Sequence, residues 1–164
     1  MLKACLVSTS SVLVALSLAS TGLADDLPSG ARTPSHNLVA SAYAGKTDLW
    51  REDCEGGIFF SSNGVASAWC AENPDNFAAG PWSVDDQGRL CTDLNWYWPK
   101  ASTGGSGMSS GGRNCIMHVT DPLGGLWRSW NGTDWWKMRP STSGLKPGYV
   151  FKENVEKTRR KLGL

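Results

Sequence analysis

The sequence predicts a mainly β fold: an antiparallel meander of about eight strands that forms a small barrel or a sandwich, with a short N-terminal helix and a C-terminal helix. Three observations favour this fold class. The 164 residues include 19 glycines and 8 prolines, which is typical of a chain with many tight turns. Between residues 46 and 140, short apolar runs alternate with turn sequences. The chain also has 9 tryptophans, whose large side chains can fill the interior of a small barrel.

The first 24 residues have the features of a secretory signal peptide. Lys3 supplies the positive charge, Cys5–Leu18 is an apolar run, and Gly22-Leu23-Ala24 is a small-x-small site, so we expect cleavage after Ala24. The apolar run is shorter than the roughly 20 residues that a membrane span needs. We therefore expect a periplasmic or secreted protein.

The exported chain begins with residues 25–45, which predict a flexible polar leader and a short helix. This helix covers Ser35–Ala44, with Ser35 as its N-cap and Gly45 at its end. Residues 46–140 form the β domain. Its predicted strands are Lys46–Arg51, Gly57–Phe60, Val65–Cys70, Gly80–Asp85, Arg89–Trp98, Asn114–Thr120, Leu126–Trp130 and Trp135–Met138.

Residues 141–164 form a basic C-terminal tail, in which Tyr149–Leu162 predicts a marginal helix. Charge is uneven: residues 25–136 hold 7 basic and 13 acidic residues, whereas residues 137–164 hold 8 basic and 2 acidic residues. A basic helix packed on an acidic β domain explains this asymmetry. The alternative is a weak contact of the tail with an anionic envelope surface. The overall charge of +1 argues against a nucleic-acid-binding protein of the usual basic kind.

The sequence predicts the strand register of one hairpin, which joins Gly80–Asp85 to Arg89–Trp98. A three-residue loop, Asp86-Gln87-Gly88, with Gly88 in the left-handed position pairs Val84 with Leu90 and Trp82 with Thr92. This register places the apolar residues on one face of the sheet, whereas a two-residue loop would mix the two faces.

The segment Pro99–Gly112 is almost entirely small and polar, with Met108 as its one large apolar side chain. Such a composition orders itself only at a high entropic cost, so we expect a flexible hairpin tip. A mobile lid is the alternative. We also expect this segment to be dispensable for folding.

Of the 5 cysteines, four lie outside the signal peptide: Cys54, Cys70, Cys91 and Cys115. An even number in an oxidising compartment favours two disulfides, and the count leaves three pairings open. A zinc site would more usually show Cys-x-x-Cys pairs, which this sequence lacks. We expect no metal and no cofactor.

Four short motifs follow one another in a characteristic order: Tyr43-Ala44-Gly45-Lys46-Thr47, Gly80-Pro81-Trp82-Ser83-Val84, Gly88-Arg89-Leu90-Cys91 and Cys115-Ile116-Met117-His118. Over roughly residues 43–138, they resemble a proteobacterial family of exported proteins known only as domain of unknown function 995. The resemblance implies a periplasmic or secreted β domain with a Cys91–Cys115 disulfide, and it implies no reaction. The chain departs from the family pattern in Cys54 and Cys70, in its glycine-serine segment and in its basic tail.

We also expect a disulfide between Cys54 and Cys70. Cys70 lies within two positions of Cys54 across the Ser61–Gly64 hairpin, and a bend at Gly56-Gly57 would bring the two sulfur atoms together.

Catalytic candidates are few. His118 is predicted to be a buried or half-buried structural histidine rather than a general base. Acids at turn tips are normally solvated, and Asp134, which lies among three tryptophans, is the only acid in a plausible apolar setting. The Gly104-Gly105-Ser106-Gly107 sequence lacks the strand-turn-helix context of a serine nucleophile. We therefore expect a non-enzymatic protein, and a hydrolase that uses Asp134 or His118 is the least favoured alternative.

Core filling explains most tryptophans, but adjacent strand residues point in opposite directions, so Trp135 and Trp136 cannot both enter the core. We expect Trp130 and Trp136 to lean outward, with Arg128 and Asp134 beside them for directional polar contacts. This pattern predicts a binding protein of the cell envelope, whose ligand is a glycan, a small molecule or an envelope protein. The alternative is a secreted inhibitor of an envelope or host hydrolase.

Overall fold

The computed structural model describes residues 24–50, 54–101, 104–141 and 143–164. The predicted signal peptide, residues 1–24, therefore lies almost wholly outside the described residues. Within the described ranges, no helix is both long enough and apolar enough to cross a membrane.

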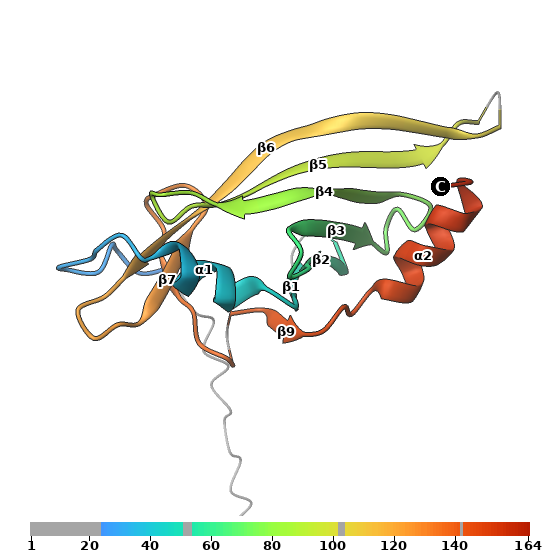
Figure 1. The fold of residues 1–164 in the computed structure, drawn as a ribbon. Coiled ribbons are helices and arrows are strands. Elements are labelled where there is room, and N and C mark those ends of the chain that lie inside the picture. Colours follow the sequence, from blue (N-terminus) through green and yellow to red (C-terminus); the bar gives the residue numbers. More distant parts are fainter. Residues whose placement is uncertain (1–23, 51–53, 102–103, 142) are drawn as a thin grey trace, which may run out of the picture.

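In the described residues, nine antiparallel strands form one sheet that curls into a half-barrel (Figure 1). The strands are β1 (Lys46–Trp50), β2 (Gly56–Phe60), β3 (Val65–Cys70), β4 (Phe77–Val84), β5 (Leu90–Pro99), β6 (Ser106–Thr120), β7 (Leu126–Ser129), β8 (Trp136–Lys137) and β9 (Leu145–Pro147). Their order in the sheet is β8-β7-β6-β5-β4-β3-β2-β1-β9. The predicted antiparallel meander is confirmed, and its single continuous sheet decides against a sandwich.

The ninth strand was not predicted. β9 has three residues, ends in a proline and has no alternating pattern of its own. It pairs with β1, so the last strand of the sequence lies beside the first. Two edges remain at β8 and β9, and these strands do not pair with each other.

The predicted register of the β4–β5 hairpin is confirmed. Val84 pairs with Leu90 and Trp82 with Thr92, and Gly88 has a φ of 71°. The Asp85 carboxylate stabilises the loop, because its Oδ1 accepts hydrogen bonds from the backbone N–H groups of residues 87 and 89. A glycine is needed at the left-handed position, where a side chain would be strained.

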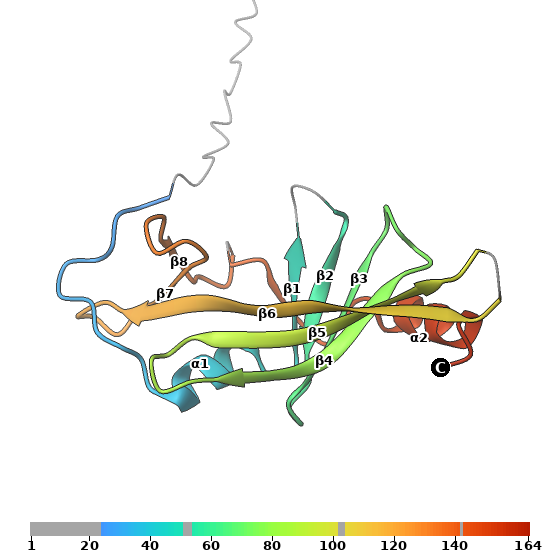
Figure 2. The same cartoon turned by 90° about the horizontal axis from the view of Figure 1, so that it is seen from above.

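Helix α1 (His36–Tyr43) packs on one face of the sheet and α2 (Lys152–Lys161) on the other (Figure 2). The Ser35 Oγ accepts a hydrogen bond from the Leu38 N–H, so the predicted N-cap is confirmed. Val39 and Tyr43 enter the larger core cluster together with apolar side chains of β2 to β5.

The basic tail is ordered at α2. Val155 and Leu162 pack against Trp69 of β3, and Lys161 forms an ion pair with Asp75. The prediction of a basic helix packed on the β domain is confirmed. Contact of the tail with an anionic envelope surface stays a prediction.

Residues 25–34 are not the flexible leader that the sequence predicts. Asp25 exchanges two backbone hydrogen bonds of 2.9 Å with Trp135. Arg32 does the same with Thr120, at 3.0 and 2.9 Å. Backbone donors and acceptors form hydrogen bonds irrespective of side-chain polarity. The polar composition of residues 25–34 therefore did not indicate that this segment is paired.

The prediction of a flexible tip at Pro99–Gly112 is also wrong for its second half. β6 begins at Ser106 and pairs with the end of β5, where Trp98 faces Gly107. A Cβ atom on Gly107 would come within 2.6 Å of the Trp98 indole, and one on Gly111 within 3.2 Å of the Trp96 indole. The glycines therefore leave room for indole rings to lie against the neighbouring strand.

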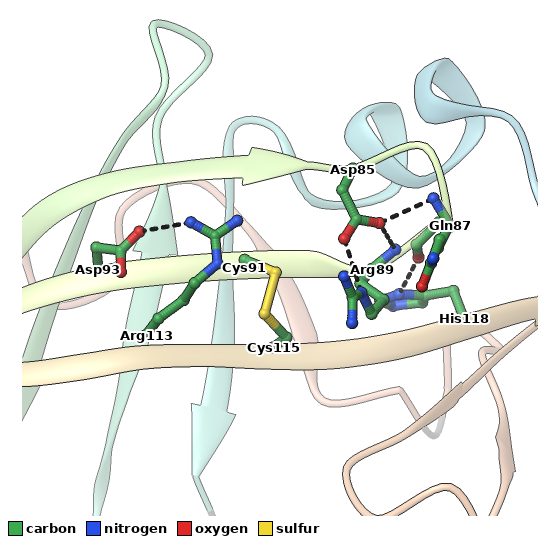
Figure 3. The surroundings of a disulfide bond; sticks show 9 residues. Asp85, Gln87, Arg89, Cys91, Asp93, Arg113, Cys115 and His118 are labelled. Atoms are coloured by element: carbon green, nitrogen blue, oxygen red, sulfur yellow. Dashed lines mark hydrogen bonds and ion pairs between the residues drawn. A yellow bond between two sulfur atoms is a disulfide. The ribbon is translucent and has the colours of Figure 1, made fainter.

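Both predicted disulfides are confirmed. Cys91 of β5 and Cys115 of β6 are directly paired residues of adjacent strands, and their disulfide lies between two ion pairs, Asp93–Arg113 and Asp85–Arg89 (Figure 3). The second disulfide joins Cys54 to Cys70. Two disulfides indicate an oxidising, extracytoplasmic environment.

Candidate binding surface

A buried ion pair closes the half-barrel. Arg128 of β7 donates from Nη1 to the Asp48 Oδ2 of β1 at 2.7 Å, and from Nη2 to the Ser143 carbonyl at 2.7 Å. Both charged side chains are nearly inaccessible to solvent. β7 and β1 lie near opposite ends of the sheet, so side chains join the two ends in place of strand pairing.

His118 and Tyr43 lie in the same interior. The His118 Nδ1 lies 3.1 Å from the Gly88 carbonyl oxygen, which can only accept, so Nδ1 is the protonated nitrogen (Figure 3). Nε2 then accepts from the Tyr43 hydroxyl at 2.8 Å. Burial lowers the pKa of His118 to about 4 and raises the pKa of Tyr43 to about 12, so both groups are neutral near pH 7.

The two candidate residues of a hydrolase, His118 and Asp134, differ in burial. His118 is 2% exposed and uses both ring nitrogens in hydrogen bonds, as expected for a structural histidine. Asp134 is exposed, and its Oδ2 accepts from the Asn131 Nδ2 at 2.6 Å. The prediction that Asp134 lies in an apolar setting is therefore wrong. The neighbouring Trp135 is buried in the interior, whereas the Asp134 carboxylate is exposed to solvent.

Trp130 and Trp136 form the aromatic patch, a name that we use for these two residues. Trp130 is 51% exposed, whereas Trp136 is half-buried. Their ring centroids lie 5.4 Å apart at an interplanar angle of 67°. The Arg128 guanidinium carbon lies 4.5 Å from the centroid of Trp130 and forms a cation–π contact with it.

The turn beside the aromatic patch is held by its own side chains. The Asn131 Oδ1 accepts from the backbone N–H groups of Thr133 and Asp134. The Ser129 Oγ accepts from the backbone N–H of Gly132 at 2.8 Å. The exposed Trp130 indole therefore projects from an ordered turn.

The expected role of Arg128 as a polar contact for a ligand needs correction. Both of its Nη atoms bind protein acceptors, on Asp48 and Ser143, and the side chain is buried. The polar groups at the surface beside Trp130 are those of Asn131 and Asp134. The pairing of Arg128 with Asp48 could not be predicted from the sequence, because 80 residues separate the two and no local pattern joins them.

Among the described residues, one cluster has the donor types of a metal site: Cys54, Cys70 and Glu72. The two cysteines form a disulfide, so neither offers the thiolate that binds a metal ion. This cluster therefore gives no support for a metal site.

Comparison with known proteins yields one match. No curated protein and no solved structure matches the chain. The model of a family described as protein of unknown function DUF995 matches residues 11–157, a longer span than the motifs of the sequence analysis cover. The chain belongs to this family, DUF995.

Proposed function

We propose that this protein is an exported, non-enzymatic binding protein of the bacterial envelope, and that the aromatic patch binds a glycan. One observation carries this proposal: Trp130 is a half-exposed indole on an ordered turn, with a buried arginine against its ring. Exposed aromatic rings that are also ordered are typical of ligand-binding surfaces.

The chemistry of the surface suits a sugar. One face of a pyranose ring is apolar and stacks on an indole, while its hydroxyl groups need polar partners. Asn131 and Asp134 supply an amide and a carboxylate on the same turn as Trp130. Trp136 lies at an angle to Trp130, so a ligand would meet a corner formed by two rings.

The rigidity of the turn favours affinity. A loop that must be ordered on binding costs free energy, whereas a preorganised loop does not. The hydrogen bonds that the Ser129 Oγ and the Asn131 Oδ1 accept from backbone N–H groups of the turn favour one conformation of it.

The proposed location rests on three features. The two disulfides are typical of an oxidising compartment. The first 24 residues have the sequence pattern of an export signal. The family resemblance concerns exported proteins.

A secreted inhibitor of an envelope or host hydrolase remains the second candidate. The observation that favours it is the length of the β5–β6 hairpin, which extends beyond the rest of the sheet (Figure 1). An inhibitor needs a rigid projection that enters a cleft, and these paired strands give such a projection. The indoles of Trp96 and Trp98 lie against Gly111 and Gly107 of the neighbouring strand and so do not project into solvent as anchors. Apart from the exposed Met108, this part of the hairpin therefore lacks a large side chain that could anchor it in a cleft, which weakens the inhibitor hypothesis.

Sedimentation with purified peptidoglycan tests the glycan proposal. The exported chain, with both disulfides formed, is mixed with insoluble peptidoglycan, and the bound fraction is measured against protein concentration. We expect saturable binding that weakens at least about tenfold in Trp130→Ala, since a central aromatic contact contributes about 2 kcal/mol or more. Trp130→Phe should keep an intermediate affinity.

Leu123→Ala is the matched control, because Leu123 is an exposed apolar residue on a different turn. It should bind as the unmodified protein does. Equal binding by Trp130→Ala and Leu123→Ala would contradict the proposal.

A further inference from the structure

A recessed site lies near Arg128, because its lining includes Ser143, whose carbonyl accepts a hydrogen bond from Arg128. A pocket of ≈ 400 Å³ opens between α1, β1, β7, β9 and the segment that follows β8. This volume falls within the roughly 300–1,000 Å³ of small-molecule sites. The pocket occupies the gap where the two ends of the sheet approach each other without pairing.

The walls of this pocket are mainly apolar. They come from Leu38, Leu126, Met138, Pro140, Leu145 and Pro147. Leu126, Met138 and Leu145 also pack against the larger core cluster, so the walls belong to the rigid part of the fold. Leu38 is 40% exposed, which leaves apolar surface of α1 uncovered at the mouth.

The charged side chains that line the pocket are basic. Lys46 and Arg139 line it, and none of the described lining residues is acidic. The Lys46 Nζ donates to the Ala42 carbonyl at 2.7 Å and to the Ser41 carbonyl at 3.5 Å, which positions the ammonium group at the end of α1 and leaves it one further donor. In the described part of the chain, neither cation forms an ion pair with a carboxylate.

We propose that this pocket binds an anionic amphiphile, with the apolar chain against Leu38 and Leu126 and the acidic head group between Lys46 and Arg139. An apolar cavity with cations at one side favours a ligand that combines hydrocarbon and negative charge, since each part of it meets its complement. A neutral or cationic amphiphile lacks the electrostatic attraction to Lys46 and Arg139. This site is separate from the aromatic patch and does not depend on the proposed glycan.

Calorimetric titration of the exported chain tests the proposal. The probes are dodecanoate, dodecan-1-ol and dodecyltrimethylammonium, each below its solubility or micelle limit, since they share a chain length and differ in head-group charge. We expect saturable 1:1 binding of dodecanoate, and binding at least about tenfold weaker for the other two. Absence of dodecanoate binding, or equal affinity for the cation, would overturn the proposal.

Two variants locate the site. Leu38→Glu places a carboxylate at the mouth and should abolish dodecanoate binding, whereas Leu123→Glu adds the same charge at an exposed residue outside the pocket lining and should not. Arg139→Gln should weaken binding about fivefold and reduce its dependence on salt, because it removes one of two cations. Equal binding by Leu38→Glu and Leu123→Glu would show that dodecanoate binds elsewhere and would overturn the proposal.

Vesicle sedimentation distinguishes the source of the amphiphile. Retention on phosphatidylglycerol vesicles that Leu38→Glu abolishes would identify a membrane lipid as the ligand. Binding of free dodecanoate without retention on vesicles would identify a free fatty acid. Both results support the pocket as an anionic amphiphile site.

Discussion

Arg128 of β7 and Asp48 of β1 form a buried ion pair of 2.7 Å between strands that lie near opposite ends of the sheet. The same arginine has Trp130 against its guanidinium, and Leu126, two residues before it on β7, lines the pocket beside α1. One side-chain contact therefore closes the half-barrel and positions the two surfaces that we propose to bind ligands. Its removal should affect the whole fold.

Replacing Arg128 alone should cost about 3–5 kcal/mol of unfolding free energy, because it leaves the Asp48 carboxylate buried without this partner. Arg128→Met in urea unfolding measures this loss. The double variant Asp48→Leu/Arg128→Met removes both charges and should lose less than Arg128→Met does. A double variant less stable than the single one would contradict the importance of charge pairing.

Stability should fall as the pH drops from 6.5 towards 4, in part through His118. Burial lowers the pKa of its imidazole from 6.5 to about 4, so the unfolded chain binds a proton in this range that the folded chain does not. The contribution of neutral His118 is complete above pH 6.5 and is lost as the pH approaches 4. A shift of this size corresponds to about 3 kcal/mol.

Unfolding experiments at pH 7, 5.5 and 4.5 on the unmodified protein and on His118→Gln test this prediction. The variant keeps a side chain that forms hydrogen bonds but does not titrate. The difference in unfolding free energy between the two proteins should shrink as the pH falls. A constant difference would show that His118 does not cause the pH dependence.

The β5–β6 hairpin should tolerate changes at its turn but not in its strand. Replacing residues 101–104 by Asn-Gly should have little effect on thermal unfolding, since a two-residue turn can join antiparallel strands. Removing residues 106–111 should cost at least about 2 kcal/mol, because it eliminates several backbone hydrogen bonds to β5 and uncovers Trp96 and Trp98. Equal stability of the two variants would indicate that this part of β6 does not contribute to folding.

Each disulfide should stabilise the folded state by reducing the conformational entropy of the unfolded chain. The bridges close loops with sequence separations of 16 and 24 residues, and loops of this size contribute roughly 3 kcal/mol. Urea unfolding of Cys54→Ser/Cys70→Ser and of Cys91→Ser/Cys115→Ser measures the two contributions separately. Peptide mapping without reduction should show no Cys54–Cys91 peptide.

Local patterns in the sequence predicted much of the fold. The Ser35 cap, the Gly88 turn and the strands up to β8 follow from turn chemistry and alternation, which act over a few residues. β9 and the start of β6 escaped prediction, because their pairing depends on backbone hydrogen bonds to distant strands. Composition at Ser106–Gly112 indicated flexibility, although its glycines serve to admit two indole rings.

The candidate site was only partly predictable. Alternation and the turn at Asn131 favoured an outward Trp130, which is the most exposed part of the aromatic patch. The burial of Arg128 could not be deduced, since Asp48 lies 80 residues away. The pocket beside α1 is built from α1, β1, β7, β9 and the segment that follows β8, and has no sequence signature.

Indole N–H resonances in a ¹⁵N–¹H spectrum test the proposed glycan surface most directly. All 9 tryptophans give one such signal each, and substitutions such as Trp130→Phe assign them. On titration with a soluble N-acetylglucosamine oligomer or a peptidoglycan fragment, we expect the signals of Trp130 and Trp136 to shift in a saturable way. The signals of Trp69 and Trp82, whose indoles donate to the Pro74 and Ser61 carbonyls inside the fold, should stay in place. If Trp130 and Trp136 remain unshifted at saturating concentrations of these glycans, the aromatic patch is not a glycan-binding surface.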